Sequence, residues 1–70
     1  METIGKNVEH LQALINAPLN PPPNWIRRWQ TEAEHVLHLA HEAKDANDLE
    51  RLREIDAEAV RLVQDREARS

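Results

Sequence analysis

Residues 44–52, KDANDLERL, decide whether the second half of this chain forms one helix or two. Asp45, Asn47 and Asp48 cluster here, and their short polar side chains compete with a helix for backbone hydrogen bonds. Asn47 is followed three residues later by Glu50, which is the spacing of a capping box at the start of a helix. The stretch therefore predicts that one helix ends here and that another begins.

A break near Ala46 leaves two helices of similar length, one on each side. We predict them over about 25–44 and about 48–68, and each would be roughly 30 Å long at 1.5 Å per residue. Matched lengths favour an antiparallel helical hairpin. Because no glycine or proline follows residue 23, one continuous coiled-coil helix over residues 25–68 is the alternative.

Apolar side chains recur every three or four residues along three segments, which is the pattern of a helix with one buried face. The three stripes are Ile4, Val8, Leu11 and Ile15; Ile26, Trp29, Ala33, Val36, Ala40 and Ala43; and Leu49, Leu52, Ile55, Ala59, Leu62 and Val63. The positions expected at the centre of the core are Trp29, Val36, Leu52 and Leu62. The sequence therefore predicts an all-α fold.

A short N-terminal helix is expected over about residues 3–16. Thr3 or Asn7 is suited to cap its first turn, because both side chains accept hydrogen bonds from backbone N–H groups. Pro18 ends this helix, since the residue before a proline is pushed out of the α-helical region.

A proline-rich linker, residues 17–23, separates the N-terminal helix from the hairpin. Its prolines favour an extended strap and reduce the conformational freedom of the unfolded chain. Asn24 is the expected cap of the next helix, which would then begin at Trp25.

The length suits a single small helical domain, residues 1–70, and a domain of this size buries only about 60% of the surface that its unfolded chain exposes. The chain has no cysteine, which excludes disulfides and thiolate metal sites. Small scaffolds without such cross-links gain stability by associating. We therefore predict a homodimer in which two hairpins form a helical bundle.

Charge and hydropathy limit the partners and the location. The net charge of −4 argues against nucleic acid as the partner. No apolar run reaches the ~20 residues of a membrane span, and the N-terminus lacks the layout of a signal peptide. We predict a cytoplasmic protein without membrane contact, and its preference for Arg, Ala and Glu is typical of bacterial and phage genomes.

Trp25, Arg27 and Arg28 combine the two residue types that often dominate the binding energy of protein interfaces. We predict that they bind a partner protein, with His35 and His38 as further contacts on the solvated side of the same helix. The alternative is a dimeric nucleic-acid-binding regulator in which Arg27 and Arg28 contact phosphates.

His35, His38 and His41 recur every three residues, so each side chain is rotated by about 60° from the one before it. His38 and His41 are a weak candidate pair for a metal ion, with Glu34 or Glu42 as a third ligand. A metal- or pH-responsive module is thus a second alternative. A solvated outer face is the simplest interpretation, and we predict no metal or other cofactor.

Asp56 interrupts the third apolar stripe at the level expected for Val36 and Leu37. Its carboxylate either reaches water at the rim of the core or pairs with an Arg, a Lys or a Trp indole of another helix or subunit. In the second case, Asp56 would specify the register or the oligomeric state.

The sequence holds no recognisable catalytic apparatus. Gly5 is its only glycine, so a glycine-rich phosphate loop is absent, and its hydroxyl side chains are limited to Thr3, Thr31 and Ser70. We therefore predict a small non-enzymatic protein–protein interaction module that regulates or inhibits a larger cytosolic protein by binding it. A phage- or plasmid-borne setting fits such a small regulator.

Overall fold

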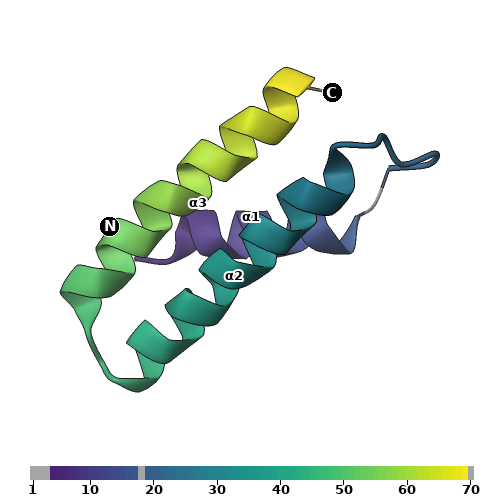
Figure 1. Cartoon of the computed structure of the whole chain (residues 1–70). Coiled ribbons are helices and arrows are strands. Elements are labelled where there is room, and N and C mark those ends of the chain that lie inside the picture. Colours follow the sequence, from purple (N-terminus) through teal and green to yellow (C-terminus); the bar gives the residue numbers. More distant parts are fainter. Residues whose placement is uncertain (1–3, 18, 70) are drawn as a thin grey trace.

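Three α-helices make up the part of the chain that the structure, a computed structural model, describes: residues 4–17 and 19–69. α1 spans Lys6–Asn16, α2 spans Ile26–Asp45 and α3 spans Leu49–Arg69, and no strand occurs in these residues. Figure 1 shows α2 and α3 side by side, with α1 crossing behind both. The prediction of an all-α fold is confirmed.

The chain leaves α2 through a turn over residues 46–48. The Asp48 N–H donates to the Ala43 carbonyl (2.9 Å), and the Asn47 N–H donates to the Lys44 carbonyl (3.0 Å). These two bonds form a Schellman motif, whose penultimate residue adopts a left-handed conformation. Asn47 takes that position with a φ of 56°, which asparagine tolerates better than most residues. Asn47 therefore ends α2.

The cap of α3 is Asp48, one residue later than the sequence predicts. Its Oδ1 accepts a hydrogen bond from the Arg51 N–H (3.1 Å), which is the third N–H of the helix. The predicted pairing of Asn47 with Glu50 is wrong because Asn47 is already committed to the end of the preceding helix.

The first turn of α2 also differs from the prediction. Trp25, and not Asn24, precedes the first helical residue, and no side chain caps the helix there. The Ile26 N–H instead donates to the Pro23 carbonyl (3.1 Å), so a backbone turn closes this end. In the linker, the Asn20–Pro21 peptide bond is cis.

α1 begins at Lys6, directly after Gly5, which has a φ of 97°. Glycine adopts this left-handed conformation without steric cost, and it therefore marks the start of the helix. Asn7, one of the two predicted caps, lies inside the first turn. The other predicted cap, Thr3, and the predicted terminator, Pro18, lie outside the described residues.

The N-terminus of α1 is bound by the half-buried Asp56 of α3. The Asn7 N–H (3.0 Å), the Asn7 side-chain amide (2.9 Å) and the Val8 N–H (3.1 Å) all donate to its carboxylate. The prediction named an Arg, a Lys or an indole as the partner of an interior Asp56. The partner is a helix terminus instead, because N–H groups in the first turn have no acceptor within their own helix.

The C-terminus of α1 is bound by Arg66, ten residues farther along α3. Its guanidinium donates to the Leu14 carbonyl and to the Ala17 carbonyl (2.9 Å for Ala17). The two charges match the helix dipole, since a carboxylate favours the N-terminal end and a cation the C-terminal end. α3 therefore supplies an acceptor and a donor for the two unsatisfied ends of α1.

The core lies where the three helices meet. Buried hydrophobic residues come from each helix, and Leu11, Ala33 and Ala59 have no exposed surface. The four positions expected at the centre of the core are all buried: Trp29, Val36, Leu52 and Leu62. Among the described residues, the exposed large hydrophobic side chain is Leu49, at 56%. One chain thus covers most of the apolar surface that suggested self-association, and the homodimer stays a prediction.

Replacing Asp56 by Ala is expected to lower the free energy of unfolding by about 2 kcal/mol, because two N–H groups of α1 lose their acceptor. Chemical denaturation followed by far-UV circular dichroism measures the loss. Glu54→Ala, which removes an exposed carboxylate from the same helix, is the control and should change the stability little. Equal stability of the Asp56→Ala variant and the wild type would contradict the role given to Asp56.

Candidate interaction site

Two tryptophans lie next to each other at the start of α2. Their ring centroids are 6.5 Å apart and their planes are inclined by 86°, which is the edge-to-face arrangement that aromatic pairs prefer. Trp29 follows Trp25 by four positions, so both occupy one side of the helix. They differ in burial, since Trp29 is only 2% exposed and Trp25 is half-buried.

Trp29 belongs to the packed interior. Its indole N–H donates to the Leu62 carbonyl of α3 (3.0 Å), and the Arg66 guanidinium carbon lies 5.1 Å from its ring centroid. Arg66 is itself only 6% exposed. A buried cation is tolerated when its donors are satisfied, and here two carbonyls at the C-terminal end of α1 and the face of the indole surround it. Arg66 and Trp29 therefore form a structural contact.

Trp25 carries a second arginine–indole contact at the rim. The Arg69 guanidinium carbon lies 5.4 Å from the Trp25 ring centroid, and Arg69 Nε donates to Asp65 Oδ1 (3.1 Å). The Arg69 and Asp65 side chains are 52% and 43% exposed. Water competes for both groups, so this contact is weaker than that of Arg66 with Trp29.

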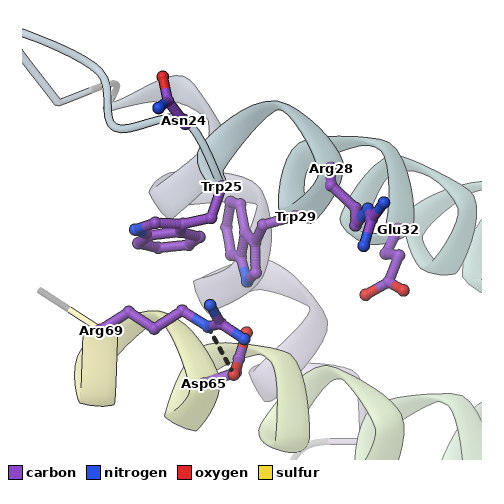
Figure 2. A pocket seen from close by; sticks show the side chains of 7 residues that line it. All are labelled: Asn24, Trp25, Arg28, Trp29, Glu32, Asp65 and Arg69. Carbon is purple, nitrogen blue, oxygen red and sulfur yellow. Dashed lines mark hydrogen bonds and ion pairs between the residues drawn. The ribbon is translucent and has the colours of Figure 1, made fainter.

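An open pocket of about 510 Å³ lies beside these side chains, between the start of α2 and the end of α3. The residues that line this Trp25 pocket are Asn24, Trp25, Arg28, Trp29, Glu32, Asp65 and Arg69. Figure 2 shows them in front of the ribbon of α1, so the pocket opens on the side of α2 and α3 that faces away from α1. Its volume is within the range of small-molecule binding pockets, but it is open to solvent and so forms a shallow surface depression.

Carboxylates of α2 and α3 surround the exposed Arg61 of α3 and raise its pKa. The Arg61 guanidinium donates to Glu58 (2.9 and 3.2 Å), and this hydrogen bond and the Glu58 charge raise the pKa of Arg61. Glu32 and Asp65 add smaller contributions in the same direction. Glu32 of α2 and Asp65 of α3 therefore both bring negative charge to the surface around Arg61.

The predicted group of Trp25, Arg27 and Arg28 is divided between two pockets. Arg28 lines the Trp25 pocket, whereas Arg27 lines another pocket of about 420 Å³ together with Pro22 and Pro23. Adjacent residues of a helix are rotated by about 100° from one another, which separates the two side chains. The two arginines consequently do not form one basic patch.

The histidines lie on the exposed surface of α2, away from both pockets. His35, His38 and His41 are exposed, and His38 Nε2 lies 3.2 Å from Glu42 Oε1. Residues 4–17 and 19–69 contain no group of three or more potential ligands placed to hold a metal ion. The third ligand that the metal hypothesis requires is therefore missing from this region.

Sequence reasoning missed the residues of α3 that complete the site. Arg66 and Arg69 follow Val63 at intervals of three, so they continue the third apolar stripe toward the two indoles. That continuation was a usable signal, because arginine can pack its guanidinium against aromatic rings. Asp65 gave no such signal, since only the fold brings it beside Arg69 and the Trp25 pocket.

The chain matches no protein-family model, no curated protein and no solved structure. None of the described helices combines the length and the apolar character needed to cross a membrane. The predicted cytoplasmic location stays a prediction.

Replacing Trp29 by Ala should lower the free energy of unfolding much more than replacing Trp25 by Ala. Loss of the buried Trp29 is expected to cost about 3–5 kcal/mol, which is comparable to the whole stability of a small domain. Loss of the partly buried Trp25 should cost less, about 2 kcal/mol, from its packing against the core, the aromatic pair and the cation–π contact. Denaturation followed by far-UV circular dichroism measures both, and equal losses would contradict the assignment.

Proposed function

We propose that this chain is a non-enzymatic protein-interaction module that regulates a larger protein by binding it through the Trp25 pocket. The observation that carries the proposal is the position of Trp25, which packs against the core on one side and is partly exposed beside an open pocket on the other. Trp and Arg are the residues most enriched among those that dominate interface energies.

The local structure holds Trp25 in place before any partner arrives. Trp29 packs against it edge to face, and the core supports its buried side. An aromatic side chain that is already ordered loses little conformational entropy on binding, which favours affinity. The Trp25 pocket therefore binds a partner at a lower entropic cost than a flexible surface would.

The charges at the pocket favour a protein over a nucleic acid. Glu32 and Asp65 line it beside Arg28 and Arg69, and both carboxylates would repel a phosphate backbone. The separation of Arg27 from Arg28 also removes the basic patch on which the nucleic-acid alternative rests. A mixed set of charges around an aromatic residue is typical of the polar rim of a protein interface.

Affinity capture from an extract of the native host tests the proposed surface. A tagged wild-type chain, a Trp25→Ala variant and a His38→Ala variant are compared by quantitative mass spectrometry of the retained proteins. The Trp25→Ala variant should lose the partner, because the main anchor is gone. The His38→Ala variant changes an exposed residue outside the pocket and should retain it.

Two results would overturn the proposal. Retention of the same partner by the Trp25→Ala variant would show that the pocket is not the binding surface. Loss of the partner only in the His38→Ala variant would place the interface on the histidine-bearing side of α2. Circular dichroism of each variant verifies that the helices are intact.

A further inference from the structure

Two arginines of α3 lie on the two neighbouring indoles, but they are held in very different ways. Arg66 is buried and donates to two carbonyls at the C-terminal end of α1, so its guanidinium is fixed by the fold. Arg69 is half-exposed, and its contacts are the face of Trp25 and a single hydrogen bond to Asp65. The structure therefore contains one permanent guanidinium contact and one that can be exchanged.

Arg69 is also the last residue of α3. Terminal turns of a helix open more easily than its middle, because fewer backbone hydrogen bonds hold them. Rotation of the Arg69 side chain away from Trp25 would leave the core undisturbed, since the buried Arg66 and Leu62 keep Trp29 in place. The place occupied by Arg69 can thus be vacated at low cost.

The position that the Arg69 guanidinium leaves, between Trp25 and Asp65, would bind another guanidinium better than the other common side-chain groups. It offers the flat face of Trp25 for stacking and the Asp65 carboxylate for hydrogen bonding, which are the two contacts that Arg69 makes. Glu32 lines the same pocket but lies beside Arg28, away from the position of Arg69, so Asp65 is the carboxylate that would meet the incoming group. Figure 2 shows Arg28 near Glu32, on the far side of Trp29 from Arg69, so its positive charge is directed away from this place.

We propose that the Trp25 pocket binds an arginine side chain of the partner protein, and that Arg69 occupies the same place in the free chain as an intramolecular competitor. This inference rests on the proposed function and names the chemistry that the partner must present. An arginine is favoured over a lysine because its planar guanidinium is less strongly hydrated and stacks on an indole. On binding, Asp65 exchanges one guanidinium for another and never remains unpaired.

A titration without any partner protein tests this proposal. N-acetyl-L-arginine N-methylamide is added to the full chain, and the indole N–H signal of Trp25 is followed by NMR. A Trp25→Phe variant identifies that signal by its absence. The Trp29 indole N–H, which donates to the Leu62 carbonyl, serves as an internal indicator of the intact fold.

The decisive comparison is between the wild type and an Arg69→Ala variant. Removal of the competitor should tighten binding of the arginine derivative by roughly threefold to fivefold. The matched control is Arg53→Ala, which removes an exposed arginine of α3 outside the pocket and should leave the affinity unchanged. The citrulline derivative, which has nearly the same shape but no charge, should bind more weakly than the arginine derivative to both forms.

Equal affinity of the Arg69→Ala variant and the wild type would overturn the role of Arg69 as a competitor. Equal binding of the citrulline and arginine derivatives would overturn the choice of a guanidinium. Either result would leave the interaction surface itself standing, because partner capture by the Trp25→Ala variant tests that surface separately.

Discussion

The short helix α1 cannot satisfy the backbone hydrogen bonds at its own two ends. Side chains of α3 satisfy them, and the rest of the structure depends on these contacts. An isolated helix of eleven residues is unstable in water, and its terminal N–H and C=O groups lack partners. Asp56 accepts hydrogen bonds at one end, and Arg66 donates them at the other. The two residues are ten apart on α3, a rise of about 15 Å. This spacing sets where α1 lies and which way it runs.

The same constraint produces the candidate site. To reach α1, Arg66 passes over the face of Trp29, and Trp29 in turn donates to the Leu62 carbonyl. That arrangement fixes one end of the α2–α3 pair and leaves Trp25 at its rim with Arg69. An arginine–tryptophan pair thus occurs twice. Arg66 with Trp29 is buried and supports the fold, whereas Arg69 with Trp25 lies at the rim, where it is accessible to a partner.

The sequence predicts the features that depend on neighbouring residues, and it misses those that depend on the fold. Helical spacing was enough to locate the buried faces and the buried Trp29. The turn after α2 was placed correctly within residues 44–52, but Asn47 was misassigned because the same residue types end helices and start them. The partners of Asp56 and Arg66 lie about fifty residues away, and no local pattern encodes such a contact.

The central claim is that Trp29 serves the fold and Trp25 remains available for binding. Hydrogen exchange of the two indole N–H groups, observed by NMR on the wild-type chain, tests this claim most directly. The Trp29 indole should exchange slower than the Trp25 indole by several orders of magnitude, because its N–H is buried and bonded to the Leu62 carbonyl. Similar exchange rates for the two indoles would contradict the account.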